Sequence, residues 1–500
     1  MALPQSRPDR STRWLVLILA IYALLAGLYA VYTPAWQAPD EPAHYNYVRH
    51  LVEERRLPEL RPGDYPVEYL EEIKAARFPP EMSVAPIRYE SHQPPLYYLL
   101  AAPVYALGRA LGMQTPLLPL RLFSVVLGIA LVAGGYAVVR RAWPARPILA
   151  WGTAAFMATL PMHVAMTGVM NNDVLAALVL TQVVWLLLWV GQRGWTAQRS
   201  VWIGLLLGLA LLTKLQAYIA VPLVGLAWLW DAERLRRRSE PLGPSVQRAL
   251  IVGGVALLLV LPWLARNVAV YGLGDPLAMA RHDQVVVGQL TTRELVGEIG
   301  IGALMQRLVQ TTFQSFWGQF GWMGVLLPLR VYQALAALSA LALLGIVDAL
   351  PALRTAWRDE SQRYSLILLG AWGGFTAAGF IWYNLQYVQH QGRYLFPALV
   401  PLGLLFAVGI QRLLRHRPLW VMGLLALTAT ALLLWGFITG EFRQFTLVLL
   451  GGAMTGIALG HELERRAVLP LAGLPLACLY AGLGGLTLWA LQHMVPLLRP

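Results

Sequence analysis

The first candidates for catalysis are an acidic pair and a histidine near the N-terminus, Asp40, Glu41 and His44. Pro39 and Pro42 flank the pair and favour a helix that begins at this point, because proline is tolerated in the first turn of a helix. Residues three or four apart share one helix face, so a carboxylate and the imidazole could act as a general base or bind a metal ion. The alternative is that both acids only cap the helix and favour its dipole.

A second candidate segment, residues 92–98, reads His-Gln-Pro-Pro-Leu-Tyr-Tyr. The proline pair restricts the backbone before it to an extended form, at the start of a further apolar stretch. His92 would then lie at the membrane surface, where it could join His44 and the acidic pair. The alternative is a solvated surface histidine with no role in chemistry.

Two charged residues stand out within apolar surroundings, Asp173 and Lys214. Asp173 is a lone carboxylate between two apolar runs, so it either caps the second run or approaches the acids of the first segment. Lys214 lies within the apolar stretch 201–229, and a charge inside a membrane usually marks a functional site. Its alternative is to extend its side chain to the outer interface.

Two arginines lie near the ends of apolar runs, in the pairs Arg266-Asn267 and Arg393-Tyr394. The guanidinium group presents a fork of donors that suits a phosphate, such as a lipid diphosphate or phosphodiester head group. A helix that begins near Leu395 would add its N-terminal amides and dipole. The alternative is that both arginines anchor the chain at the membrane interface.

Several common catalytic motifs are absent from the sequence. It has no Walker A loop, no Gly-x-Gly-x-x-Gly fingerprint followed by an acid, no Gly-x-Ser-x-Gly elbow and no His-Glu-x-x-His. ATP hydrolysis, dinucleotide chemistry and zincin proteolysis therefore have no support. Cys478 is the single cysteine, which excludes a disulfide or a cysteine-based metal site within one chain.

The composition shows which kind of scaffold positions these residues. Hydrophobic residues make up 57% of the 500 residues and charged residues 13%, whereas soluble domains carry roughly 45–50% and about 25%. The chain is therefore predicted to be an all-α polytopic membrane protein. Lys+Arg number 39 against 26 Asp+Glu, but most of the arginines cluster between apolar runs, as in cytoplasmic loops. Nucleic-acid binding is not indicated.

Apolar runs of membrane length predict about thirteen transmembrane helices. They cover residues 14–33, 117–139, 148–169, 174–190, 200–215, 216–232, 249–265, 331–349, 364–383, 395–411, 418–438, 444–460 and 468–491. The first run follows Arg7, Arg10 and Arg13 and is interpreted as a retained signal anchor with a cytoplasmic N-terminus. With these spans, the six downstream arginine clusters all fall on the cytoplasmic side, as the positive-inside rule requires.

The stretch 95–112 decides the topology. Counting it as a span would place arginine clusters on the outside, so we expect it to lie in the plane of the interface. Two long extracytoplasmic segments remain, 34–116 and 266–330, and they are too apolar for disorder. We therefore expect a long first outer loop with in-plane helices, and chemistry on the extracytoplasmic face.

The ordered set of motifs resembles the GT-C superfamily of membrane glycosyltransferases. The most similar branch is the protein-mannosyltransferase and aminoarabinose-transferase-like one, with its bacterial relatives. The matching pieces are Pro39-Asp40-Glu41-Pro42-x-His44, His92-Gln93-Pro94-Pro95-Leu96-Tyr97-Tyr98, Asn172-Asp173, Thr213-Lys214, Trp263-x-x-Arg266-Asn267 and Gly392-Arg393-Tyr394-x-x-Pro397. The last hundred residues add only spans, so residues 1–411 are expected to form the catalytic module and 412–500 additional helices.

The resemblance implies transfer of a sugar from a polyprenyl-phosphate carrier to a glycan, lipid or protein acceptor at the outer face of a bacterial plasma membrane. It implies that Asp40 is the catalytic base or orients the acceptor, with Glu41 as its partner and Asp173 as a further catalytic acid. The expected substrate-binding residues are His44, His92, Tyr97, Lys214, Arg266, Asn267, Arg393 and Tyr394. Because such a transfer is one displacement at the anomeric carbon, inversion of configuration is predicted.

The sequence departs from the branch just before the proline pair. Some relatives carry an acid and a lysine there, whereas this chain has His92 and Gln93. The sequence therefore does not decide whether a divalent metal ion is a cofactor, and His44, His92 and Asp40 are its weak candidate ligands. Two other functions are kept as alternatives, a transporter or flippase for lipid-linked glycans and a ligase that acts on them.

Overall fold

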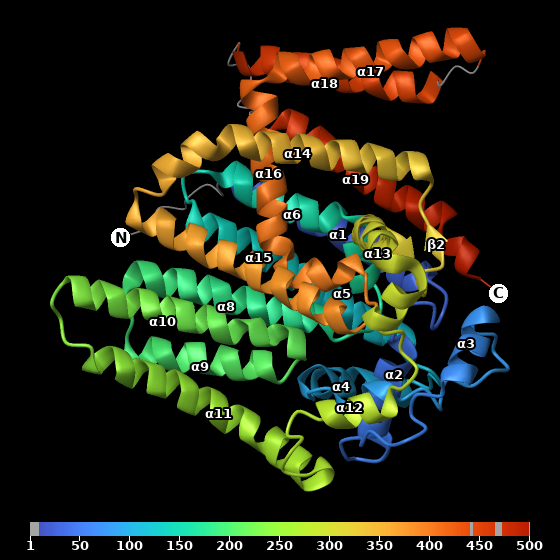
Figure 1. Ribbon diagram of the computed structural model, residues 1–500, viewed down its shortest axis with the longest axis vertical. Helices are drawn as coiled ribbons and strands as arrows, with labels where there is room; N and C mark the ends of the chain where they lie inside the picture. The colour runs from blue at the N-terminus through green and yellow to red at the C-terminus, as the bar shows by residue number, and fades with distance from the viewer. Residues whose placement is uncertain (1–9, 441–443, 466–472, 500) are drawn as a thin grey trace.

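The computed structural model describes residues 10–440, 444–465 and 473–499, and this part of the chain is almost entirely helical (Figure 1). Within the described residues, nine helices are long and apolar enough to cross a membrane. A tenth crossing results if α6 and α7, which are bent by 68°, form one broken span. The predicted all-α polytopic fold is confirmed at this level, while the number of thirteen crossings stays a prediction.

The helices follow one another with short connections. In the first half of the chain they are α1 (Arg10–Tyr32), α2 (Glu41–Glu53), α3 (Val67–Ala75), η1 (Tyr89–His92), α4 (Leu96–Ala110), α5 (Leu117–Ala142), α6 (Pro147–Thr159), α7 (Pro161–Thr167), α8 (Asp173–Arg193), α9 (Ala197–Leu211), η2 (Leu215–Ile219), α10 (Ala220–Arg237) and α11 (Gly243–Tyr271). In the second half they are α12 (Met279–Val285), α13 (Thr292–Trp317), α14 (Leu329–Ala356), α15 (Glu360–Gln386), η3 (Gly392–Ala398), α16 (Leu399–His416), α17 (Pro418–Thr439), α18 (Gln444–Arg465), α19 (Leu474–His493) and η4 (Val495–Leu498). A two-stranded antiparallel hairpin joins β1 (Gln319–Phe320) to β2 (Val325–Leu326).

The predicted apolar runs are mostly helical where the chain is described, but residues 212–214 of the run 200–215 lie in the break between α9 and η2; the start of the last run, 468–472, lies outside the described residues. The run 148–169 departs from a straight span because it is broken between α6 and α7. Leu160 has an extended backbone (ψ 113°) and Pro161 opens α7. Proline lacks an amide donor and disfavours a helical residue before it, so the helix bends here.

The stretch 95–112 contains α4, which begins directly after the proline pair. Its 15 residues are fewer than the about 20 that a crossing requires. The helix packs against α2 and α5. That the stretch lies in the plane of the interface stays a prediction.

The two long segments between spans are folded and in contact. The first contains α2, α3, η1 and α4, and the second contains α12, α13 and the hairpin. Trp322 donates its indole N–H to the carbonyl of Trp36 at 3.0 Å, which ties one segment to the other. In Figure 1, α2, α3, α4 and α12 gather at one end of the molecule. The helices α17 and α18 form a hairpin at the opposite end.

Close packing fixes α16, the helix that follows η3. A Cβ atom added to Gly345 of α14 would lie 1.9 Å from the carbonyl oxygen of Gly409 on α16. The two backbones therefore touch, as is common where small residues pair in membrane helices. This contact holds α16, and with it the η3 turn, against the rest of the bundle.

Candidate active site

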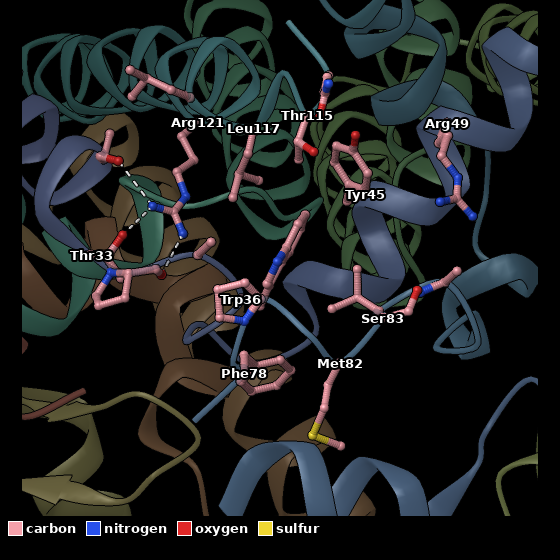
Figure 2. Close-up of a pocket in the computed structure, with 18 of the residues that line it drawn as sticks. Thr33, Trp36, Tyr45, Arg49, Phe78, Met82, Ser83, Thr115, Leu117 and Arg121 are labelled. Atoms are coloured by element: carbon pink, nitrogen blue, oxygen red, sulfur yellow. Dashed lines mark hydrogen bonds between the residues drawn. The ribbon is translucent and has the colours of Figure 1, made fainter. Parts of the chain in front are cut away.

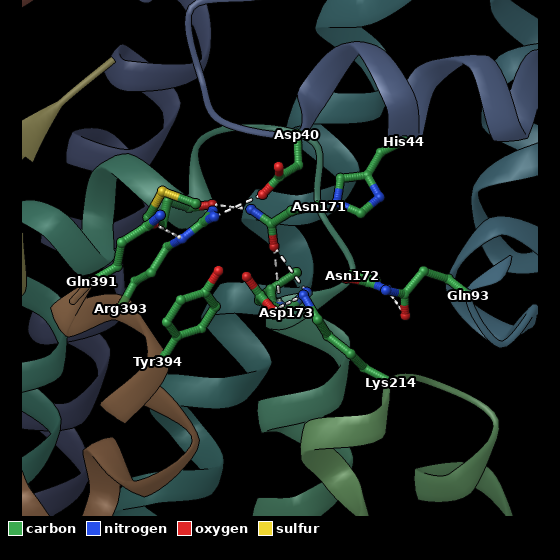
Figure 3. A network of polar contacts seen from close by, with 12 residues as sticks. Asp40, His44, Gln93, Asn171, Asn172, Asp173, Lys214, Gln391, Arg393 and Tyr394 are labelled. Atoms are coloured by element: carbon green, nitrogen blue, oxygen red, sulfur yellow. Dashed lines mark hydrogen bonds and ion pairs between the residues drawn. The ribbon is translucent and has the colours of Figure 1, made fainter. Parts of the chain in front are cut away.

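Two carboxylates and two cations from four separate elements meet at one end of the bundle (Figure 3). We call Asp40, Asp173, Lys214 and Arg393 the charged centre. Asp40 precedes α2, Asp173 opens α8, Lys214 links α9 to η2, and Arg393 lies in η3. The structure therefore brings together four residues that the sequence analysis had selected separately.

Asp40 is held by two hydrogen bonds to its side chain. Its Oδ1 accepts from the Tyr89 hydroxyl at 2.8 Å, and its Oδ2 accepts from Nη2 of Arg393 at 2.7 Å. Asp40 is the N-cap residue of α2 by position, but its side chain makes no capping bond, so the capping alternative is wrong for its carboxylate. Its backbone is left-handed (φ 67°), a conformation that aspartate and asparagine tolerate better than most residues.

Asp173 and Lys214 form the second pair of the charged centre. The Lys214 Nζ lies 2.5 Å from Oδ1 of Asp173, so the lysine has found a partner within the protein. Capping of α8 falls to another residue, because the Asn171 side-chain oxygen accepts from the amides of Asp173 and Val174. The Asp173 carboxylate is thereby free to face the centre, and its side chain is 28% exposed.

Arg393 is positioned by its own turn. Its Nε donates to Oε1 of Gln391 at 2.7 Å, and its guanidinium lies 5.3 Å from the centre of the Tyr394 ring. The Arg393 side chain is only 6% exposed, against 25% for the side chain of Asp40. The carboxylate is thus the more accessible partner of this pair.

A neutral polar layer lies beside the charges. Nδ1 of His44 is 2.9 Å from the Tyr98 hydroxyl, which also accepts from the side-chain amide of Asn172 at 3.4 Å. Burial lowers the pKa of His44, so its imidazole is uncharged at neutral pH. Tyr97, predicted to bind substrate, points elsewhere and shares a hydrogen bond with Ser124 of α5. Of the two tyrosines that follow the proline pair, Tyr98 therefore lies at the charged centre and Tyr97 does not.

Glu41 faces away from the charged centre and is completely buried. Its two oxygens accept from Nε and Nη2 of Arg121 at 2.8 and 2.6 Å. They also accept from the backbone amides of Trp36 and Met170, each at 3.1 Å. Arg121 in turn donates to three carbonyls at the end of α1. This network joins α1, α2 and α5 and fixes the turn that carries Asp40.

His92 is buried, so the alternative of a solvated surface histidine is wrong. Its Nδ1 lies 3.0 Å from the carbonyl of Tyr89, and its ring centre lies 4.6 Å from that of His282 in α12. Burial lowers its pKa to about 3, which leaves the ring neutral. The histidine joins η1 to the second long segment, and no hydrogen bond among the described residues links it to His44.

Arg266 and Asn267 lie apart from the charged centre. The Arg266 guanidinium donates to the carbonyl of Pro58 and to the side-chain oxygen of Asn267. Asn267 donates to the carbonyl of Pro276 at 3.0 Å. These contacts brace the C-terminal end of α11, and no hydrogen bond among the described residues connects them to Asp40 or Arg393.

The predicted metal ligands do not form a cluster. No group of three or more His, Cys, Asp or Glu side chains that could hold a metal ion occurs within the described residues. Asp40 is taken by Tyr89 and Arg393, and His44 by Tyr98. The described residues therefore do not form a preformed metal site.

Several residues of the site were missed by the sequence analysis. Tyr89, Tyr98 and Asn171 hold the groups of the centre through the bonds described above. Glu90 follows Tyr89 in η1, and its carboxylate oxygen Oε2 is buried with no hydrogen-bond partner in the described part of the chain. Tyr89 and Glu90 directly precede the predicted His92 segment, and that proximity was the only sequence signal for them.

The electrostatics of Asp40 give a prediction for its pH dependence. Burial raises its pKa, but the charge and hydrogen bond of Arg393, together with the hydrogen bond from Tyr89, outweigh this and hold the pKa well below the usual range. A depressed pKa stabilises the folded state above the ordinary value of about 4, and this contribution is lost as the pH falls through the lowered pKa. In thermal melts, we expect the difference between wild type and Asp40→Asn to stay constant from about pH 5 to 7. A difference that shrinks already between pH 7 and 5 would contradict this.

The fold and the charged centre define a polytopic membrane protein whose polar site lies where several spans leave the bilayer. Residues 92–265 match the family described as dolichyl-phosphate-mannose-protein mannosyltransferase. The chain is also similar to the structure of ArnT from Cupriavidus metallidurans bound to undecaprenyl phosphate, with 18% identity and a TM-score of 0.56, over 97% of this chain and 78% of that one. The apo structure of the same protein gives 19% identity and a TM-score of 0.56, over 98% and 79%. No curated protein sequence matches the chain.

These comparisons confirm the resemblance to GT-C membrane glycosyltransferases of the branch predicted from the motifs. The structural similarity establishes the fold over nearly the whole chain. The family match covers residues 92–265, a segment that includes Asp173 and Lys214.

Proposed function

We propose that the protein transfers a sugar from a polyprenyl-phosphate carrier to an acceptor nucleophile at the extracytoplasmic face of a bacterial plasma membrane. The observation that carries this proposal is the charged centre, two carboxylates paired with two cations at one end of the spans. A glycosyl transfer needs both kinds of group. The acceptor needs a proton acceptor or precise placement, and the departing lipid phosphate needs positive charge.

Arg393 and Lys214 are the groups that bind the phosphate of the donor. Arg393 uses Nε and Nη2 for Gln391 and Asp40, and no hydrogen bond within the described residues occupies its Nη1. Lys214 makes one bond, to Asp173, and has two further N–H donors. Both cations can therefore bind an anionic oxygen without first losing their carboxylate partners. As the bond from the anomeric carbon to the phosphate oxygen breaks, they stabilise the charge on the leaving group.

Asp40 accepts the proton of the acceptor. While Arg393 binds it, the low pKa of Asp40 makes it a weak base. When the donor phosphate draws the guanidinium toward itself, this stabilisation of the carboxylate weakens and its basicity increases. The acceptor oxygen or nitrogen then bonds to the anomeric carbon, its proton passes to Asp40, and the lipid phosphate leaves. Donor binding thus prepares the base.

The remaining predicted residues have supporting roles in this proposal. Asp173 keeps Lys214 charged and directed to the centre, and its partial exposure allows contact with the sugar or the acceptor. His44 and Tyr98 form a neutral wall beside the acceptor. Glu41 is a positioning residue that acts through Arg121, and Arg266 and Asn267 brace the outer end of α11.

The proposal includes the topology predicted from the arginine clusters. The N-terminus lies in the cytoplasm, and the loops that carry the clusters lie on the same side. All four residues of the charged centre then lie on the opposite face, because Asp40 follows α1, Asp173 precedes α8, Lys214 follows α9 and Arg393 precedes α16. Residues 1–411 form the catalytic module, and residues 412–500 add helices to it.

Inversion at the anomeric carbon tests the single displacement. The product of the purified enzyme, made from a polyprenyl-phosphate sugar of defined anomeric configuration, is expected to carry the opposite configuration in its NMR coupling constants. A product with the configuration of the donor would rule out this mechanism.

A further inference from the structure

A large cavity lies beside α2, and Figure 2 draws the residues that line it. Its volume is about 960 Å³, and the charged centre contributes no residue to its lining. Tyr45 and Arg49 of α2 line it, four residues apart on one helix face, whereas His44 points to Tyr98. The Arg121–Glu41 pair closes the wall between the cavity and the turn that carries Asp40. The cavity is thus a separate compartment of ligand size.

The cavity is basic. Arg49, Arg109 and Arg499 line it, and no hydrogen bond or ion pair of the Arg49 side chain occurs within the described residues. Arg109 uses Nη1 for the carbonyls of Met113 and Gln114, which leaves its other donors available. Glu53 is the only acid among the described residues that line the cavity, and its Oε1 accepts a hydrogen bond from the Tyr105 hydroxyl at 2.6 Å. An unneutralised guanidinium at the wall of a cavity favours an anionic ligand.

The mouth of the cavity is apolar where α1 ends and α5 begins. Val31, Tyr32 and Leu118 belong to the lining and are 56%, 52% and 43% exposed. In a membrane protein, such side chains at the ends of two spans face lipid. The cavity therefore combines arginines inside with an opening toward the bilayer surface.

We propose that this cavity is a second binding site, for an amphipathic anion whose phosphate group reaches Arg49 and Arg109 while its acyl chains lie against the ends of α1 and α5. A phosphate-bearing lipid has this chemistry. The ligand enters from the membrane and is recognised by its head group. The site is distinct from the proposed donor site at Arg393 and does not depend on it.

The test uses the full-length protein in detergent and measures binding of dioctanoyl phosphatidic acid by native mass spectrometry. The double variant Arg49→Gln/Arg109→Gln is expected to bind this lipid at least about tenfold more weakly, because two charged donors are lost. Arg56→Gln is the matched control in the same outer segment, since its partner is Glu54 and it does not line the cavity. Neither side chain of the double variant pairs with another side chain in the described structure, so the fold is expected to persist.

The controls separate the outcomes. Arg393→Ala is expected to bind phosphatidic acid as wild type does, so a failed donor site does not mimic a failed second site. Dioctanoyl phosphatidylcholine and inorganic phosphate are expected to bind weakly, because one lacks net charge and the other lacks acyl chains. Equal binding of the wild type and the double variant would overturn the proposal. Inorganic phosphate that binds as well as phosphatidic acid would overturn the lipid assignment.

Discussion

Replacing Asp40 by asparagine is expected to reduce sugar transfer by at least about a thousandfold in kcat/KM, because the acceptor loses its proton acceptor. The substitution is mild for the backbone. Asp40 has a left-handed conformation, and asparagine tolerates it as well as aspartate does. The amide oxygen can still accept from Tyr89 or Arg393, so the turn before α2 is kept. The measurement is turnover of a polyprenyl-phosphate sugar by the purified variant.

Two further variants show that this loss reflects chemistry. Tyr89→Phe removes one of the two bonds to Asp40 and leaves the carboxylate, so a smaller loss is expected, on the order of tenfold. Glu71→Gln changes an exposed carboxylate of α3 in the same segment and is expected to keep full activity. An Asp40→Asn enzyme that is folded and retains more than a tenth of the activity would show that Asp40 is not the proton acceptor.

Replacing Glu41 by glutamine is expected to destabilise the protein by about 3–5 kcal/mol, the typical result of removing one partner from a buried ion pair. Glu41 is fully buried, and Arg121 would keep its charge with no carboxylate beside it. The new NH2 group would also face the amide of either Trp36 or Met170, which is a donor itself. Unfolding followed by intrinsic fluorescence in one detergent measures the change.

The cause can be assigned with a double-mutant cycle. Glu41→Gln combined with Arg121→Gln is expected to cost less than the sum of the two single changes, because the unpaired charge is gone. Arg121 also satisfies three carbonyls at the end of α1, so recovery is incomplete. Asp348→Asn breaks the partly exposed ion pairs with Arg412 and Arg417 and is expected to have a much smaller effect than Glu41→Gln. If Glu41→Gln proves as harmless as Asp348→Asn, the buried network is not what holds the turn.

The sequence was sufficient for the scaffold and for four residues of the centre. Hydropathy and arginine placement depend on the bilayer, which acts on long stretches, so they identify spans well. Asp173 and Lys214 could be recognised because a charge beside apolar runs requires a partner. Each was then found with the other.

Side-chain direction could not be predicted from the motifs. Asp40 and Glu41 are neighbours in the chain, yet the left-handed backbone at Asp40 turns one carboxylate to Arg393 and the other to Arg121. Tyr97 and Tyr98 likewise point in different directions, because adjacent helix residues are about 100° apart. Arg121 lies within the predicted apolar run 117–139, but the sequence does not indicate its carboxylate partner, which lies 80 residues away.

The most direct test of the proposed function is to identify the lipid that copurifies with the protein in nanodiscs, by native mass spectrometry, beside Arg393→Ala. We expect a polyprenyl phosphate, with or without a sugar, in the wild type and its loss in the variant, because Arg393 binds the phosphate of the donor. The bound sugar would then name the donor for the Asp40→Asn turnover assay. Bulk phospholipid alone in both samples would contradict the account. A polyprenyl-diphosphate oligosaccharide would instead favour a ligase or flippase.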